Sequence, residues 1–422
     1  MPPAIRRARS LLLGVAALGA LSLAPGCGGS GVSRGSGSAS GSGRAGGSGA
    51  AGGGFDAGGA GDGAGGLGGA AGIGPGGTAG GLGGAAGAGG IGPGGSAVGG
   101  AGAPAGAGGS IGGGSGGLAC PGATYDPASP PGTLVLSGNL GAHDPAAYVS
   151  GDTIVLAATG LTAKTSTDLL TWRAASNPLA LPDWARTATG ATNLWAPDIS
   201  QFGGAYHLYY SASTFGSNHS CIGQATRASL DSGSWMDQGM VLCSNADPAV
   251  KDDWNAIDPN VAVDDAGTAW LVFGSFWSGI KAVQLDASGR RADSKLWSLA
   301  NHANGGIEGA WVFHRCGTYY LFVSWGACCN GAFDYNIRVG RSSAVTGPYL
   351  DKAGVAMTAG GGTLLVQGNA RWVAPGHNAV IAYRGKTYNL YHALDGGSTG
   401  AATLRIAEVV WDAAGWPVSG GP

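Results

Sequence analysis

A strand–turn–strand unit recurs five times in this sequence, and the repeat limits the folds that the chain can adopt. Its clearest copy lies in residues 255–281, where a turn at Asp258 precedes two short strands, 261–263 and 269–273, and a third strand follows Gly279. Short strands separated by turns that contain Gly and Asp are typical of an antiparallel meander. The five copies begin at His143, Ala196, Ile257, Ile307 and Pro375.

The spacing of these copies indicates the fold class. Successive copies start about 50 to 70 residues apart, which suits the blades of a β-propeller better than a sandwich or a solenoid. Five copies therefore predict an all-β chain that folds as a five-bladed β-propeller.

A polar residue beside Pro or Gly opens each copy. In a propeller the first strand of each blade lines the central channel, so these residues should meet at one mouth of the channel. Crowded carboxylates repel one another unless they share protons, bind a cation or take part in acid–base chemistry. An Asp before Pro also opens strands for purely structural reasons, but a charged residue at the same phase of five copies favours a functional site. The five residues are Asp144, Asp198, Asp258, Glu308 and His377.

The first 27 residues have the pattern of an export signal. Three arginines among the first nine residues precede an apolar run over residues 11–23, which is too short to span a membrane. We therefore expect an exported protein. Cys27 follows Ala24-Pro25-Gly26, which resembles a lipoprotein cleavage site, and both lipid anchoring at the cell envelope and release as a secreted protein stay open.

Residues 28–118 are almost entirely Gly, Ala and Ser and supply most of the 87 glycines. Such a segment has no large apolar face whose burial would offset the entropy of ordering it. The sequence therefore predicts a flexible linker here. The remaining residues, 119–422, form the predicted propeller domain.

The low charge of the chain limits the kinds of molecule that it can bind. The net charge of -2 and the 11% of charged residues leave no basic stripe, so nucleic acid is a poor partner and a neutral polymer a better one. We expect a monomer.

The cysteines are better explained by disulfides than by a zinc site, because the chain is expected to be exported and none of its cysteines has the spacing of zinc ligands. Which cysteines pair with one another stays open. The cysteines after Cys27 are Cys120, Cys221, Cys243, Cys316, Cys328 and Cys329.

Several motifs, in order, resemble those of the endo-1,5-α-L-arabinanases of glycoside hydrolase family 43. The resemblance covers residues 143–417, and that family folds as a five-bladed propeller, in agreement with the number of repeats. The motifs are LWAPDI at 194–199, YYSASTFGSN at 209–218, NAIDPNV at 255–261, FGSFWSGIK at 273–281, IEGAWVF at 307–313, the stretch 335–355 and APGHNAV at 374–380.

The resemblance implies an inverting glycosidase that cuts internal bonds of arabinan, a plant cell-wall polysaccharide. By motif, Asp144 is the general base, Glu308 the general acid, and Asp258 the carboxylate that orients and tunes the acid. An inverting enzyme separates its acid and base by about 6.5 to 9.5 Å to leave room for a water molecule, and blades across a channel suit that gap. One departure is Ala310, where the family commonly has Pro; we expect altered backbone detail rather than lost activity.

The same motifs imply the substrate-binding residues. Aromatic faces stack on sugars, and fixed polar groups bind their hydroxyls. Packing between blades is the alternative fate of these aromatic residues, and it is our expectation for Tyr209, Tyr210, Trp270 and Tyr320. The predicted substrate-binding residues are Asp144, Trp195, Phe215, Gly216, Asn255, Ala256, Ile257, Asp258, Ser275, Phe276 and Trp277.

His377 matches the position at which the family holds a cation, often calcium, in the channel. Imidazole is an unusual ligand for a hard cation, so water or backbone oxygens would have to supply most other ligands. A hydrogen-bonded structural histidine is the alternative, and the resemblance favours the metal.

Two other functions remain open at this stage. An exo-acting arabinofuranosidase or a β-xylosidase would use the same propeller and the same three carboxylates. A non-catalytic glycan-binding propeller would also suit the long linker, but it would not require the three carboxylates. Fold by itself does not decide the substrate.

Overall fold

The computed structural model describes residues 122–422 except residues 248, 250, 304, 330–333 and 398–399. The expectations for the export signal, the linker, Cys27 and Cys120 lie outside this part of the chain. Within it, helix is limited to α1 (Asp183–Thr189) and the 3-10 turns η1 (Thr159–Leu161) and η2 (Met357–Ala359). None of these described helices is long and apolar enough to cross a membrane.

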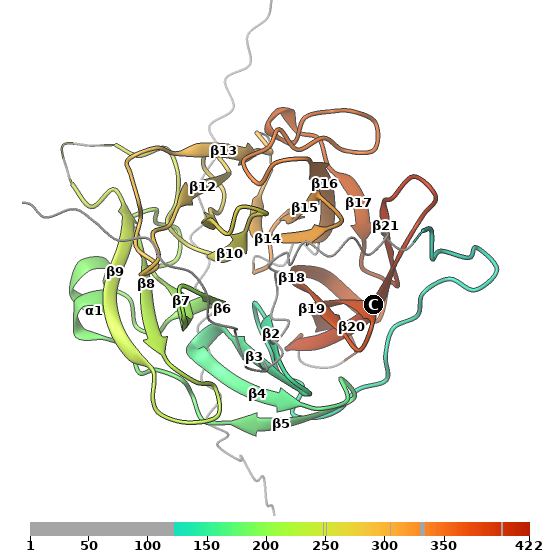
Figure 1. The fold of residues 1–422 in the computed structure, drawn as a ribbon, viewed down its shortest axis with the longest axis horizontal. Helices are drawn as coiled ribbons and strands as arrows, with labels where there is room; N and C mark the ends of the chain where they lie inside the picture. Colours follow the sequence, from blue (N-terminus) through green and yellow to red (C-terminus); the bar gives the residue numbers. More distant parts are fainter. Residues whose placement is uncertain (1–121, 248, 250, 304, 330–333, 398–399) are drawn as a thin grey trace, which may run out of the picture. The chain divides into compact units, whose positions relative to one another are not determined.

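The described residues form five β-sheets, each built on an antiparallel meander of four strands, and we call these sheets blades 1 to 5 (Figure 1). Blade 1 comprises β2 (Ala146–Ser150), β3 (Thr153–Ala158), β4 (Thr162–Ser166), β5 (Thr171–Ala175) and β1 (Ser137–Gly138), which pairs with β5 in parallel. Blade 2 comprises β6 (Trp195–Phe202), β7 (Ala205–Ala212), β8 (Ser220–Arg227) and β9 (Met236–Ser244). Blade 3 comprises β10 (Asn260–Val263), β11 (Ala269–Phe273), β12 (Ile280–Gln284) and β13 (Trp297–Ala300). Blade 4 comprises β14 (Ile307–Arg315), β15 (Thr318–Trp325), β16 (Asn336–Ser342) and β17 (Thr363–Val366). Blade 5 comprises β18 (Trp372–Tyr383), β19 (Lys386–Asp395), β20 (Ala402–Trp411) and β21 (Pro417–Ser419).

The first strands of the blades, β2, β6, β10, β14 and β18, surround the centre of the molecule (Figure 1). Each of them contacts the first strand of the next blade, and β18 contacts β2, so the cycle is closed. The five-bladed propeller expected from the repeats is therefore confirmed.

The hydrophobic core is divided among the interfaces between successive blades. Five clusters of buried side chains each join two neighbouring blades, and the one that joins Leu156 of blade 1 to Leu390 and Ile406 of blade 5 closes the ring. The four aromatic residues expected to pack between blades are all buried, which confirms that expectation. They are Tyr209, Tyr210, Trp270 and Tyr320.

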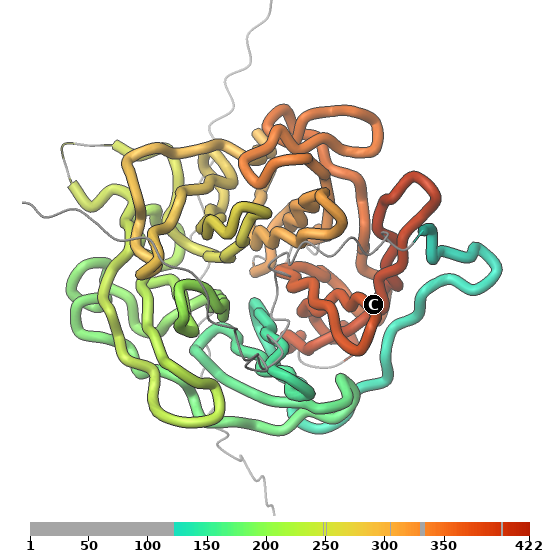
Figure 2. The backbone as a smooth tube through the Cα atoms, viewed as in Figure 1, coloured from blue at the N-terminus to red at the C-terminus, as the bar shows by residue number. Residues whose placement is uncertain are grey.

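The segment 134–141, which contains β1 and precedes β2, joins the last blade to the first (Figure 2). The Leu134 N–H donates to the Ile406 carbonyl at 2.8 Å, and Gly141 pairs with Thr403 on the same strand, β20. The Lys164 ammonium of blade 1 holds this segment by donating to the Asn139 side chain and the Gly141 carbonyl. The ring is therefore closed by main-chain hydrogen bonds as well as by side-chain packing.

Two disulfides have both of their cysteines in the described part of the chain. Cys221 and Cys243 face each other across β8 and β9, and the adjacent Cys328 and Cys329 are bonded to each other. Cys316 is disulfide-bonded too. These pairings agree with the expectation of disulfides rather than zinc.

Each blade has a residue with left-handed backbone geometry just before its innermost strand or within it, and in blades 2, 4 and 5 the pairing register shifts at this residue. A positive φ is uncommon for residues other than glycine and often marks a functional site. The bulge turns the chain at the channel mouth. The five residues are Asp144 (φ 53°), Ala196 (40°), Asp258 (59°), Gly309 (58°) and His377 (48°).

Candidate active site

Three of the predicted carboxylates meet at one end of the channel, each from a different blade. Asp144 precedes β2, Asp258 precedes β10, and Glu308 is the second residue of β14; all three are buried. His377 of β18 lies between two of them, because its Nδ1 is 3.2 Å from Asp144 Oδ1 and 4.0 Å from Asp258 Oδ2. The Gly309 N–H, next to Glu308, donates to Asp258 Oδ2 at 3.1 Å. These contacts connect the blades that carry the three carboxylates.

Asp198 does not share this position, and its expected place in the ring was wrong. In blade 2 the left-handed residue is Ala196, so Asp198 lies two residues further along β6. There it accepts hydrogen bonds from the Asn260 side chain at 3.0 Å and from the Val261 N–H at 3.3 Å. Burial raises the pKa of Asp198 to about 7 despite these two donors. Asp198 therefore links blade 2 to blade 3 beneath the mouth.

Asp144 lies among donors and imidazoles. Thr159 Oγ1 donates to Asp144 Oδ2 at 2.5 Å, and His143 Nδ1 lies 2.9 Å from the same oxygen. Burial opposes ionisation, but the nearby imidazoles of His143 and His377 outweigh it and lower the pKa of Asp144. His143 in turn has a raised pKa, because Asp144 outweighs the effect of burial. Asp144 is therefore ionised, which is the form that a general base requires.

Glu308 and Asp258 have the opposite electrostatic environment. Burial raises the pKa of Glu308, with a contribution from Asp144, although Ser275 Oγ donates to Glu308 Oε2 at 2.8 Å. Burial also raises the pKa of Asp258, and the charges of Glu308 and Asp144 add to this shift. Two interacting carboxyls titrate as a pair. The pair therefore holds a proton at a pH at which an isolated carboxyl has lost it.

The predicted aromatic residues are on the surface or near it. Phe215 is 67% exposed and Trp277 45% exposed, and Trp195, the first residue of β6, is half-buried. Phe276 packs beside Gly306 and its N–H donates to the Ile307 carbonyl at 2.8 Å, directly next to Glu308. The residues around Phe276 and Trp277 therefore lie on the Glu308 side of the mouth.

Phe215 and Gly216 lie in the loop between β7 and β8, and both are exposed. This loop follows the end of β7 that carries Ser211, whose Oγ accepts the Asp258 N–H at 2.9 Å. The loop therefore starts from the strand end that supports Asp258.

The other predicted binding residues are buried beneath the mouth. Ala256 donates its N–H to Ser244 Oγ at 3.0 Å, and the Ile257 carbonyl accepts the Gly274 N–H at 2.9 Å. Asn255 differs from these two, because its side-chain oxygen is buried and has no hydrogen-bond partner among the described residues. Among these three residues, only Asn255 has a side-chain oxygen left to accept a hydrogen bond.

Sequence reasoning missed three residues around the carboxylates. His143 directly precedes Asp144 and Tyr335 opens the family-like stretch 335–355, so both lay next to a signal, but His392 carried none. The His392 ring stacks on His143, with ring centroids 4.6 Å apart, and on Tyr335 at 5.9 Å. The pKa of Tyr335 is raised well above its ordinary value by burial and by Glu308 and Asp144.

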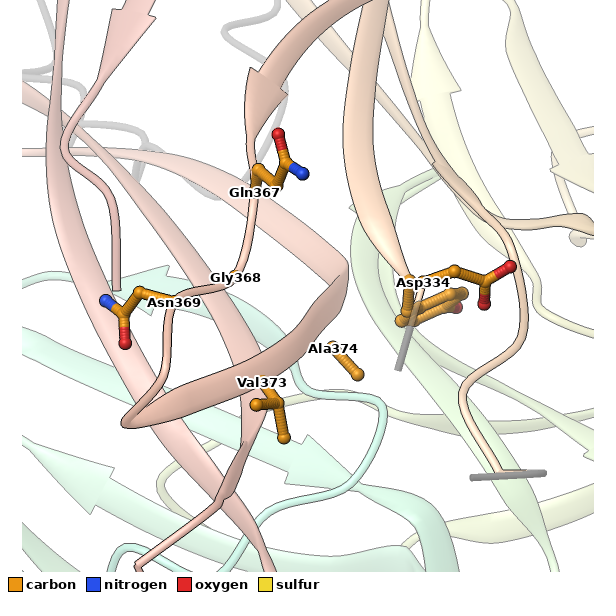
Figure 3. Close-up of a pocket in the computed structure, with 7 residues that line it drawn as sticks. Asp334, Gln367, Gly368, Asn369, Val373 and Ala374 are labelled. Atoms are coloured by element: carbon orange, nitrogen blue, oxygen red, sulfur yellow. The ribbon is translucent and has the colours of Figure 1, made fainter. Parts of the chain in front are cut away.

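A pocket lies between the ends of β16, β17 and β18 (Figure 3). Tyr335 lines this pocket and is within reach of the charges of Glu308 and Asp144, so the pocket adjoins the site on the side of blades 4 and 5. The lining residues are Asp334, Tyr335, Gln367, Gly368, Asn369, Val373 and Ala374.

An ionised aspartate and a carboxyl pair that holds a proton are the two groups that a glycoside hydrolase needs to activate water and protonate a leaving oxygen. A propeller that carries them at its channel mouth belongs to that class of enzyme. The chain is a member of the glycosyl hydrolases family 43, whose family model matches residues 140–417. The expected family is thereby confirmed.

Relatives in this family have high similarity over the propeller. An extracellular exo-α-(1→5)-L-arabinofuranosidase of Cellvibrio japonicus is 40% identical over 298 residues, which cover 65% of this chain and 85% of the relative. An extracellular endo-α-(1→5)-L-arabinanase of Bacillus subtilis is 39% identical over 287 residues, which cover 65% and 86%. Both relatives are matched over most of their own length.

Solved structures of arabinanases are similar to this chain as well. The α-L-arabinanase of Cellvibrio cellulosa superimposes with a TM-score of 0.62 at 40% identity, over 66% of this chain and 95% of that one. A structure of that α-L-arabinanase complexed with arabinohexaose also matches, with a TM-score of 0.62 at 39% identity over 66% and 95% of the two chains. The family 43 endo-arabinanase of Bacillus licheniformis has a TM-score of 0.62 at 40% identity, over 68% and 99%.

Proposed function

We propose that this chain hydrolyses internal α-1,5-L-arabinofuranosidic bonds of arabinan with inversion of configuration. The observation that carries the proposal is the opposite electrostatics of Asp144 and of the Glu308–Asp258 pair at one channel mouth. The names of the relatives, which act on α-(1→5)-linked arabinan, supply the substrate.

Each carboxylate has one role in this proposal. Asp144 removes a proton from the attacking water, and Glu308 gives its proton to the departing glycosidic oxygen. Asp258 shares a proton with Glu308 and, in its ionised form, favours the protonated form of Glu308 by charge. Its Oδ2 also accepts the Gly309 N–H, which fixes the backbone next to the acid. The oxygen of the water bonds to the anomeric carbon as the glycosidic bond breaks. Asp144 then gives its proton to solvent and Glu308 takes one up, so both groups are regenerated and no proton is gained or lost overall.

The proposed sugar contacts are made by exposed aromatic side chains and by a buried side-chain oxygen that has no hydrogen-bond partner among the described residues. The exposed faces of Phe215 and Trp277 offer stacking surfaces, with Trp195 and Phe276 closer to the carboxylates. Asn255 offers a side-chain oxygen that lacks a partner in the described part of the chain, as an acceptor for a sugar hydroxyl would.

We extend the proposal to a cation at His377, for which calcium is the candidate. Burial lowers the pKa of His377, and the neutral imidazole is the form that binds a cation. If Nδ1 carries its proton toward Asp144 at 3.2 Å, the lone pair on Nε2 is left for the ion. Because calcium prefers oxygen ligands, water would complete the shell. A bound cation would offset the negative charge of Asp144 and Asp258.

Export is part of the proposal as well. The names of the two relatives describe extracellular enzymes, and the Arg-rich, apolar start of this chain has the pattern of an export signal. The finer alternative is a lipid anchor at Cys27. Metabolic labelling with a radioactive fatty acid, with Cys27→Ser as the control, separates an anchored from a secreted protein.

The size of the products tests the main proposal. Purified enzyme is incubated with linear arabinan and, in parallel, with xylan, and the products are separated by length at early times. Arabino-oligosaccharides of mixed length support internal cleavage, whereas a single short product from the start supports the exo mode named for the Cellvibrio japonicus relative. Activity on xylan alone, or on neither polymer, contradicts the proposal.

A further inference from the structure

A repeated hydrogen bond supports the left-handed residue of the next blade. In three of the five interfaces a hydroxyl at the end of a blade's second strand accepts the N–H of that residue, which satisfies a buried backbone donor. The pairs are Thr159 with Ala196 at 3.0 Å, Ser211 with Asp258 at 2.9 Å, and Ser324 with His377 at 2.7 Å. Between blades 3 and 4, where glycine 274 has no side chain to offer, the Gly309 N–H donates to Asp258 instead.

The interface that carries Asp144 departs from this rule. The residue in the hydroxyl position of blade 5 is His392, and its Nδ1 accepts the Asp144 N–H at 3.1 Å. A small hydroxyl is enough to hold the backbone elsewhere in the ring. The larger imidazole of His392 therefore has a role at this interface beyond the backbone hydrogen bond.

The hydrogen bond fixes the protonation state of His392. Because Asp144 N–H donates to Nδ1, that nitrogen carries a lone pair and the ring proton is on Nε2. If Nδ1 also carried a proton, its N–H would point at the backbone N–H of Asp144. His392 is fully buried, and burial lowers its pKa well below the ordinary value, in agreement with a neutral ring. With its lone pair occupied, Nδ1 is also not free to bind a metal together with His143 and Asp144.

The face of the ring supports the Asp144 carboxylate. His143, which pairs with Asp144 Oδ2 at 2.9 Å, stacks on one face of His392 with an interplanar angle of 23°. Tyr335 stacks at 5.9 Å and an angle of 18°. A serine or threonine would keep the backbone bond but give His143 no flat surface to rest on. His392 thus holds Asp144 at its backbone directly and at its carboxylate through His143.

The geometry points to His392 as a positioning residue for the general base: a neutral imidazole that fixes both the backbone of Asp144 and the His143–Asp144 pair. This inference rests on the proposed role of Asp144 as the base. Displacement of the general base lowers kcat far more than it weakens substrate binding, because the attack of water on the sugar requires a narrow range of geometries. Substitution of His392 should therefore act on kcat rather than on KM.

The first experiment replaces His392 by the residue that other blades use. In His392→Ser we expect kcat on linear arabinan to fall about tenfold or more, with KM changed by less than about twofold. His392→Asn keeps an acceptor near the Nδ1 position, and His392→Phe keeps the flat face, so each should lose less than the serine variant. If the serine variant does not fold, the Asn and Phe variants carry the test.

The control for a general loss of stability is Leu390→Ala, on the same strand and fully buried in the interface between blades 1 and 5. It should lower the thermal midpoint and leave kcat at low temperature unchanged. The inference is overturned if His392→Ser turns over like the wild type, or if its loss of kcat is no larger than that of Leu390→Ala.

A second variant separates this inference from the proposed function. If Asp144→Asn is inactive while His392→Ser is normal, the inference fails alone. If Asp144→Asn remains active, the base assignment fails and the inference fails with it. Independently of activity, ¹⁵N spectra of the histidine-labelled full chain, with His392→Asn to assign the signal, should give an unprotonated Nδ1 and a protonated Nε2. A protonated Nδ1 contradicts the proposed contact.

Discussion

At the scale of single residues, the site separates two kinds of carboxyl group by their neighbours. Asp144 faces His143, His377 and a hydroxyl donor, and it is ionised. Burial and the charge of Asp144 raise the pKa of Glu308, so Glu308 retains its proton more strongly. Opposite environments of this kind assign the base and the acid without reference to any relative.

Asp144→Asn and Glu308→Gln test these two roles. Each change removes one proton-transfer group and hardly alters side-chain volume, so we expect hydrolysis of arabinan to fall by about 10² to 10⁴-fold with folding intact. Steady-state kinetics and the thermal midpoint measure the two effects. Near-normal turnover in either variant would show that the role of that residue was wrongly assigned.

Asp258→Asn tests the tuning of the acid by charge. The active form of Glu308 is the protonated one, so the basic limb of the pH–rate profile follows its pKa. Removing a neighbouring negative charge lowers that pKa, and the basic limb should therefore move to lower pH. The rate should fall less for an aryl arabinoside with a good leaving group, if it is accepted, than for arabinan. An unmoved basic limb with equal slowing of both substrates would contradict charge tuning.

At the scale of the strand, the bulge within β18 depends on a glycine. A Cβ on Gly376 would lie 1.9 Å from Tyr335 Cε1, so the ring of Tyr335 packs directly on the backbone next to His377. The absence of a side chain at this position lets Tyr335 reach the carboxylates. The APGHN motif thus has a packing reason as well as a chemical one.

Gly376→Ala is expected to destabilise the protein and to impair turnover. The added methyl group must displace a buried aromatic ring, and overpacking of this kind costs about 1 to 3 kcal/mol. Chemical denaturation and kcat measure the two effects. Gly132→Ala is the control, since a Cβ there meets nothing within 4 Å. Equal behaviour of the two variants would mean that the packing around Tyr335 adjusts freely.

At the scale of the whole molecule, the ring is closed by chain segments from its two ends. The segment 134–141 contributes the main-chain bond from Leu134 to Ile406 and packs Leu134, Leu136 and Leu140 against the interface of blades 1 and 5. Closure therefore depends on residues that precede the first complete repeat.

Two truncations separate the linker from the closing segment. Deletion of residues 28–117 should leave the thermal midpoint and the turnover of soluble arabino-oligosaccharides unchanged, because a Gly-rich coil adds no packed contacts. Extending the deletion to residue 141 should lower the midpoint strongly, because apolar burial and main-chain bonds are lost. Calorimetry measures both. A large loss with the shorter deletion would show that the linker packs against the propeller.

The fold and most of the site residues were predictable from the sequence. Alternating apolar residues and the Gly and Asp turns are local signals, and they determined the strands of blade 3 and the number of blades. The polar residue that opens each copy pointed to Asp144, Asp258, Glu308 and His377, because equivalent strands of a propeller surround the same channel.

Only the tertiary structure decided the position of Asp198 and the parts played by His392 and Tyr335. Asp198 is displaced by a bulge, a shift of two residues that strand patterning does not encode. His392 lies 248 residues from Asp144 in the sequence, and the two meet only because the last blade packs against the first. Contacts between blades bring together residues that are remote in the chain, and no local pattern of the sequence specifies them.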